Sequence, residues 1–165
     1  VFDAMMTKDF LENRGRWVIS DEVEAKLNDE PGGGRKAVAD RYVVRDYPKV
    51  FGNLFPRRQL MIHTETWTPD GAGGYQGDYT CDVQDAPVLV EGVMTLKPSG
   101  GGCELRTLHT IPAKMPIIGK RVEKYILGQT RDQYWDQLHY LDMQLAGTAD
   151  LLPRDTNRYP LPKNK

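Results

Sequence analysis

One long segment without proline constrains the fold of this 165-residue chain more than any other feature. Pro112 and Pro116 come just before it, where proline suits the approach to a helix, and the next proline is Pro153. Within it, one set of side chains recurs at spacings of four and three residues, which is typical of one face of an amphipathic helix: Ile118, Val122, Ile126, Thr130, Tyr134, Leu138, Leu141 and Leu145. Gly147 is placed to end that helix. A helix over residues 117–146 needs a large apolar surface to lie on, and the rest of the chain has to supply it.

The preceding sequence reads as a series of β-strands. Residues 16–27 alternate, with Trp17, Ile19 and Val23 on one face and charged side chains on the other. Further segments rich in β-branched and aromatic residues follow, so that the predicted strands span residues 16–27, 35–47, 58–68, 75–83, 88–97 and 103–111. Residues 1–15 predict one or two short helices that end at Gly15. This order predicts an α+β domain in which an antiparallel sheet curves around the last helix.

Three glycine-rich loops, at residues 31–34, 69–74 and 98–102, fall between predicted strands. A phosphate-binding loop needs a helix N-terminus directly after its glycines, so we interpret these loops as hairpin turns.

Charge and composition exclude several classes of function. The net charge is −1 and the pI is near 6.3, which argues against an electrostatically driven nucleic-acid binder. No apolar run reaches the length of a transmembrane helix, and no signal-peptide pattern is visible. We therefore expect a soluble, intracellular protein. Because the chain starts at Val1, we expect residues upstream, and an organelle stays open as its location if a targeting segment was removed with them.

Residues 73–126, together with the element order, resemble the START-like (helix-grip, SRPBCC) superfamily, most closely a bacterial subfamily described only as a domain of unknown function. The residues that carry the resemblance are Gly77, Ala86, Pro87, Gly92, Pro116, Gly119 and Glu123. The resemblance implies a helix-grip domain over residues 1–147, with its usual first strand upstream of residue 1 and an extended proline-rich tail at residues 148–165. It also implies an internal apolar cavity of the kind used for lipids or other hydrophobic ligands.

Strand parity and the helix stripe predict which side chains face that interior. The candidates for the ligand cavity are Val23, Tyr42, Ile62, Tyr79, Val90, Met94, Leu105, His109, Ile126, Thr130 and Tyr134. A ligand site mixes apolar walls with a few polar groups, and this set does so. The alternative is a filled core in which each hydroxyl is satisfied locally.

His63 and Glu65 share one strand face with Trp67, which raises a metal or acid–base site as a hypothesis. Two ligands are too few for zinc, so we predict a solvated or locally hydrogen-bonded pair instead. We expect Cys81 to be a small core residue that forms no disulfide with Cys103, because a third strand separates their strands. No catalytic set, metal or cofactor is predicted.

Trp135 and His139 fall on the outer side of the predicted helix, where an exposed tryptophan would indicate a partner surface. The alternative is packing of Trp135 on the N-terminal helices or the tail. Further candidates for partner contact lie in the tail: Leu151, Leu152, Tyr159 and Leu161.

The first hypothesis for function is a non-enzymatic protein that binds a hydrophobic small molecule or lipid in its cavity. The second is a structural accessory subunit of a larger assembly that docks through the tail and the outer helix face. The third is an enzyme of cyclase or hydrolase type, for which the sequence offers no convergent acid, base and nucleophile.

Overall fold

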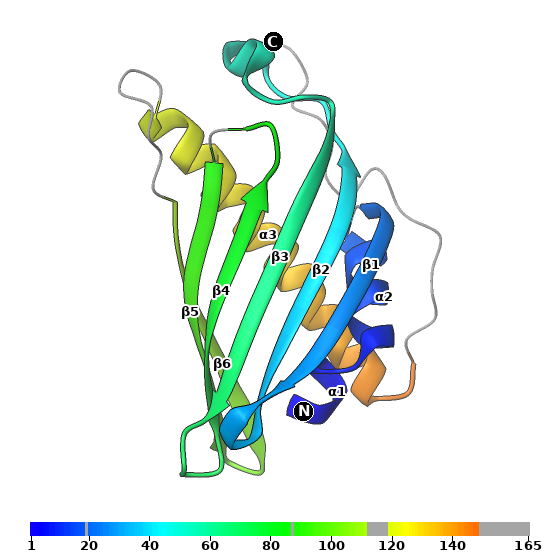
Figure 1. Cartoon of the computed structure of the whole chain (residues 1–165), viewed down its shortest axis with the longest axis vertical. Coiled ribbons are helices and arrows are strands. Elements are labelled where there is room, and N and C mark those ends of the chain that lie inside the picture. The colour runs from blue at the N-terminus through cyan, green and yellow to red at the C-terminus, as the bar shows by residue number, and fades with distance from the viewer. Residues whose placement is uncertain (19, 87, 112–118, 149–165) are drawn as a thin grey trace.

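The computed structural model describes residues 1–18, 20–86, 88–111 and 119–148 (Figure 1). Two helices, α1 (Phe2–Met5) and α2 (Lys8–Val18), come first. The strands β1 to β6 and the long helix α3 follow: Ser20–Glu30, Gly34–Val44, Arg58–Pro69, Tyr75–Val83, Val88–Ser99, Gly102–Thr110 and Gly119–Leu145. Two short 3₁₀-helices, η1 (Pro31–Gly33) and η2 (Lys49–Leu54), interrupt the chain.

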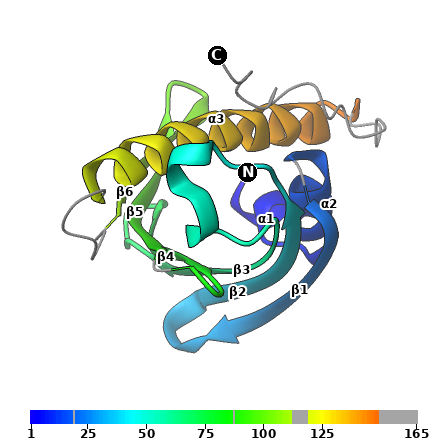
Figure 2. The same cartoon turned by 90° about the horizontal axis from the view of Figure 1, so that it is seen from above.

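The six strands form one antiparallel sheet in the order β1-β2-β3-β4-β5-β6. Most of the connections between consecutive strands are short turns, which join neighbouring antiparallel strands. The longest connection, residues 45–57, contains η2 and also joins neighbouring strands. The sheet curves, and α3 runs across its concave side (Figure 2). The predicted α+β, helix-grip-like architecture is therefore confirmed.

The N-terminal helix continues three residues beyond its predicted end. Gly15 does not stop α2, which runs to Val18, and β1 begins at Ser20. Gly15 lies against β1 instead: a Cβ atom there would make a tight contact of 3.0 Å with Val23 Cγ2. The absence of a side chain at this residue allows α2 to approach the strand closely. Because α2 continues to Val18, the prediction of a strand starting at residue 16 was wrong.

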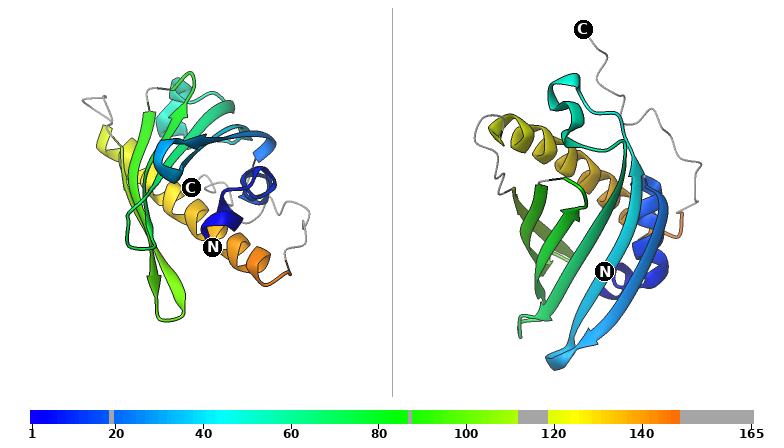
Figure 3. Two further views of the ribbon diagram at one scale, coloured as in Figure 1. Left: turned by 60° about the horizontal axis from the view of Figure 1, so that its bottom comes forward. Right: turned by 45° about the horizontal axis from the view of Figure 1, so that its top comes forward.

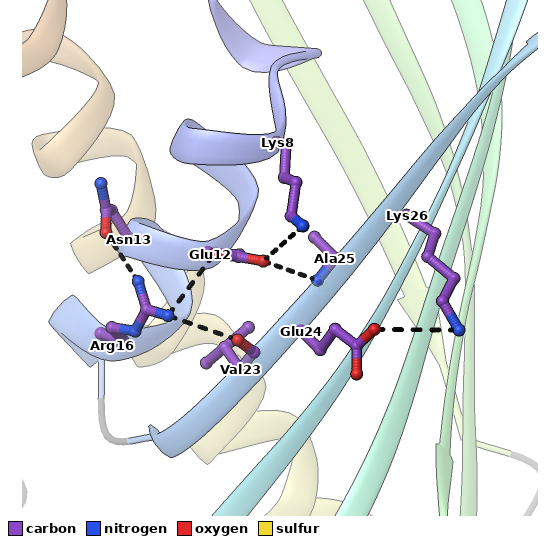
Figure 4. Close-up of polar contacts among 8 residues, drawn as sticks. All are labelled: Lys8, Glu12, Asn13, Arg16, Val23, Glu24, Ala25 and Lys26. Atoms are coloured by element: carbon purple, nitrogen blue, oxygen red, sulfur yellow. Dashed lines mark hydrogen bonds and ion pairs between the residues drawn. The ribbon is translucent and has the colours of Figure 1, made fainter.

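Helix α2 also covers the free edge of the sheet at β1 (Figure 4). The amide of Ala25 donates a hydrogen bond to Glu12 at 3.2 Å, and Arg16 donates one to the Val23 carbonyl at 3.4 Å. The Ala25 amide is the main cause of a lowered pKa at Glu12. An uncovered strand edge invites pairing with other chains, and these side chains occupy the edge instead.

The core lies between the concave face of the sheet and α3. Burial along β2 and β3 alternates, with odd-numbered residues such as Ala39, Met61 and Trp67 facing inward. The predicted helix stripe holds at Val122 and Ile126, whereas Leu145 is exposed. The stripe also holds at Leu141, and it missed Gly119, Gln133 and Tyr140, which are buried as well.

The second half of α3 packs on the N-terminal helices (Figure 2 and Figure 3). The Tyr140 ring lies 5.7 Å from the rings of both Phe10 and Trp17. The last turns of α3 meet α2 and not the sheet. Tyr140 is therefore buried there, whereas Leu145 is exposed.

The glycine-rich loops are turns between strands, as predicted. In the β3–β4 loop, Asp70 accepts hydrogen bonds from the amides of Ala72 at 2.8 Å and Gly74 at 2.9 Å, and these bonds lower its pKa. None of the described helices is long and apolar enough to cross a membrane.

Several predictions concern residues that lie outside the described ones. These are the tail from residue 149 on, the helix start at residues 117 and 118, and the single residues Ile19, Pro87, Pro112 and Pro116.

Candidate ligand-binding cavity

A cavity opens between the concave face of the sheet and α3. Its apolar wall comes from the strands, from the residue that directly follows η2 and from one residue of α3: Phe55, Met61, Val83, Val90, Met94 and Ile126. Its free space is about 50 Å³, which holds a few water molecules and not a drug-sized ligand. A larger occupant would have to displace side chains, and Met61 and Met94 are the flexible ones among the apolar set.

Seven of the eleven predicted cavity residues line this space: Tyr79, Val90, Met94, His109, Ile126, Thr130 and Tyr134. Val23 is buried beside Gly15 instead, and Leu105 lines a neighbouring groove. Whether the cavity binds a ligand stays a prediction.

The prediction that Tyr42 and Ile62 face the interior was wrong. Inward-facing residues on β2 and β3 are odd-numbered, so both side chains lie on the convex face. Tyr42 stacks there on the Arg58 guanidinium, 3.8 Å from its ring centre. Side chains alternate with a period of two, and β2 carries apolar residues at both parities, so its pattern does not identify the inner face.

A row of four rings crosses the cavity from β3 to α3. His63 contacts Tyr79 edge to face at 4.5 Å between ring centres, Tyr79 contacts His109 at 5.1 Å, and His109 contacts Tyr134 at 5.5 Å. Tyr134 also accepts a hydrogen bond from the Thr107 hydroxyl. The row therefore runs from β3 through β4 and β6 to α3.

Burial sets the ionisation of these groups. It is the main cause that holds the pKa of His63 well below its ordinary value, and it lowers the pKa of His109. It also raises the pKa of Tyr79 well above the ordinary value and raises the pKa of the Cys81 thiol. At neutral pH these imidazoles, this phenol and this thiol are uncharged, so none of the four adds charge to the cavity.

Glu65 pairs with a residue that the sequence did not suggest. Its carboxylate accepts hydrogen bonds from Arg14 of α2 and, at 3.3 Å, from Trp67 Nε1. Of the two states predicted for His63 and Glu65, the solvated one was wrong, since both side chains are buried. Glu65 is hydrogen-bonded locally to Trp67, as the other state predicted, and its ion-pair partner is Arg14. Among the described residues, no group of three histidine, cysteine or acidic side chains is placed to hold a metal.

Arg41 is a buried arginine that lines the cavity, and the sequence did not suggest it either. It lies on β2 opposite Met61, and only 5% of its surface is exposed. Its Nε atom has no hydrogen-bond partner among the described residues, and neither has His63 Nε2. The sequence signal was an arginine at the same parity as Ala37, Ala39 and Val43, which are all buried.

An open groove of about 810 Å³ adjoins the cavity between β6 and α3. His109 and Tyr134 line both spaces, so these two side chains lie where the groove and the cavity adjoin. Trp135 lines the groove with 65% of its surface exposed, and His139 is exposed farther along α3. Trp135 is therefore not covered by the N-terminal helices. The other alternative, packing of Trp135 on the tail, lies outside the described residues.

The two cysteines behave as expected. Cys81 is buried on β4, Cys103 is exposed on β6, and both are free thiols. The four other candidates for partner contact, Leu151, Leu152, Tyr159 and Leu161, lie outside the described residues.

A curved antiparallel sheet, a C-terminal helix across its concave side and a cavity between them define a helix-grip-like α+β domain. Residues 1–141 match the family described as "Protein of unknown function (DUF2505)", and the chain belongs to this family. A search of the curated proteins found no match.

Proposed function

We propose that the protein binds an apolar small molecule, without chemical change, in the cavity under α3. The observation that carries the proposal is the make-up of the cavity wall, in which apolar side chains surround two buried nitrogen atoms, Arg41 Nε and His63 Nε2, that have no hydrogen-bond partner among the described residues. That mixture is typical of ligand sites, where the apolar part supplies affinity and the polar part fixes orientation. The resemblance to the START-like superfamily, to which we propose the chain is distantly related, supports the same use of this space.

The size of the cavity limits the ligand or requires motion. About 50 Å³ accommodates only part of a lipid chain, whereas the adjoining groove offers about 810 Å³. We propose that the ligand enters from the groove past Tyr134 and His109, and that the Met61 and Met94 side chains move aside. Each methylene buried in this way adds about 0.8 kcal/mol to binding.

A substitution that fills the cavity tests the proposal. Met94→Trp places an indole in the cavity and should reduce uptake of N-phenyl-1-naphthylamine, an uncharged probe that fluoresces in apolar surroundings. Val93→Trp is the matched control, because Val93 directly precedes Met94 on β5 and its side chain is exposed on the convex face. Uptake that is unchanged in Met94→Trp, in a protein that still melts cooperatively, would indicate a packed core with no ligand.

Ile126→Ala gives a second reading if Met94→Trp does not fold. It removes side-chain volume from the wall and should increase uptake of the same probe. Native mass spectrometry of protein from its natural source would then show the mass of any ligand that stays bound.

A role as accessory subunit is the second candidate function, favoured by the exposed Trp135 in its groove. Aromatic side chains of this kind are frequent anchors of protein interfaces. The test is co-purification of partner chains with the wild type, with Trp135→Ser and with a variant that lacks residues 150–165. Loss of one partner in either variant, with cooperative melting retained, would support this role.

A further inference from the structure

We infer that the ligand of this cavity is an apolar monocarboxylate, whose carboxylate binds Arg41 while its hydrocarbon part lies against Met61, Val90 and Met94. The inference rests on the proposed function and specifies the ligand class.

The charges buried in the described part of the chain do not balance. Arg14, Arg41 and Glu65 are the buried side chains that carry charge at neutral pH, because the lowered pKa of His63 leaves that imidazole neutral. Glu65 is engaged by Arg14. Arg41 therefore remains as one positive charge without a counter-ion among the described residues.

A guanidinium is rarely buried in this condition, since removing it from water is costly unless an anion compensates. No carboxylate of the described residues lies within 4 Å of Arg41. The Cys81 thiol is a polar neighbour of Arg41. Burial raises the pKa of this thiol, and the charge of Arg41 partly offsets that effect. A thiol is a weak acceptor and carries no compensating charge.

The surroundings of Arg41 describe the rest of the ligand. It lines the cavity together with Met61, Val90 and Met94, so a group bound to it is continuous with apolar wall. His63, which lines the same cavity, has a free Nε2 that can donate to or accept from the same ligand. The planar fork of a guanidinium matches the two oxygens of a carboxylate, and one carboxylate neutralises the one excess charge.

The experiment compares matched ligands that differ only in their polar group. Hexanoate, octanoate and decanoate are titrated against hexanol, octanol and decanol by calorimetry or by displacement of N-phenyl-1-naphthylamine. At the chain length that binds tightest, the wild type should bind the carboxylate at least tenfold more tightly than the alcohol. Arg41→Met should remove this difference and keep the affinity for the alcohol. Arg58→Met, which removes an arginine from the convex face, should leave the difference unchanged.

Each result bears on a defined statement. If alcohols bind and carboxylates bind no better, or if Arg41→Met keeps the preference, the inference is wrong while the proposed function stands. If octyl phosphate binds more tightly than octanoate, the assignment of a carboxylate is wrong. If no ligand of either series binds, the proposed function fails and the inference fails with it.

A stability measurement gives an independent reading of Arg41. Without ligand, Arg41→Met removes an uncompensated charge and keeps a side chain of similar length, so its melting temperature should equal or exceed that of the wild type. Loss of folding in both Arg41→Met and Arg41→Gln would show that the charge is needed by the fold itself, which would overturn the inference.

Discussion

Glu65→Gln isolates the charge of the buried ion pair between α2 and β3. The substitution preserves shape and leaves an oxygen that still accepts a hydrogen bond from Trp67 Nε1. What it removes is the negative charge next to Arg14, in a pair whose side chains are 9% and 6% exposed. Two arginines, Arg14 and Arg41, would then be buried with no buried carboxylate among the described residues.

The cost follows from the burial of the pair. Removing one partner of a buried ion pair typically destabilises a protein by about 3–5 kcal/mol, because the other charge stays buried without compensation. A domain of this size has a total stability of about 5–15 kcal/mol, so the variant should be marginal. Urea unfolding followed by circular dichroism measures the difference, with the midpoint read at an unchanged slope.

Two further variants determine whether the reasoning holds. The double variant Arg14→Met with Glu65→Gln should regain most of the loss, because no uncompensated charge is left by the pair. Glu24→Gln is the matched control, since Glu24 makes an exposed ion pair with Lys26 that is worth at most about 1 kcal/mol. A cost below about 1 kcal/mol for Glu65→Gln, or a double variant no more stable than the single one, would refute the argument.

Two other predictions concern packing and pH. Gly92→Ala should cost about 1–3 kcal/mol in urea unfolding, since its Cβ would lie 2.7 Å from the Leu108 carbonyl oxygen and 3.0 Å from the His109 ring. At Gly128 in α3, nothing lies within 4 Å of an added Cβ atom, so Gly128→Ala should instead stabilise the protein by about 0.5–1 kcal/mol. Equal changes in stability for Gly92→Ala and Gly128→Ala would contradict both predictions. The pKa of His63 is lower in the folded state than the ordinary value of 6.5, so below pH 6.5 the unfolded chain binds the extra proton. Above pH 6.5, His63 should therefore have no effect on the free energy of unfolding. Below pH 6.5, the free energy of unfolding should fall by up to about 1.4 kcal/mol per pH unit. His63→Phe should reduce this dependence on pH.

The sequence alone determined the order and type of the elements. Alternation and glycine-rich turns predicted the strands from β2 on to within a few residues, and β4 was predicted at its observed bounds, Tyr75–Val83. The long stretch without proline predicted α3. These features depend on local backbone preference and on short turns, which neighbouring residues encode directly.

The composition of the cavity was only partly accessible from the sequence. Parity placed Tyr79, Met94 and His109 correctly, because one face of each of their strands is clearly apolar. It failed on β2 and β3, where Tyr42 and Ile62 gave a false inner face. The buried polar residues there, Arg41 among them, occupy positions that a rule based on hydrophobicity assigns to solvent.

Only the tertiary structure decided the partners of the buried charges and the route of α3. Arg14 and Glu65 are 51 residues apart in the chain, and they meet because α2 folds over the sheet. Tyr140 is buried because α3 extends beyond the sheet onto Phe10 and Trp17. Periodicity along a segment encodes which side of that segment is apolar. It does not encode which distant segment will cover that side, because this depends on the packing of all the elements together.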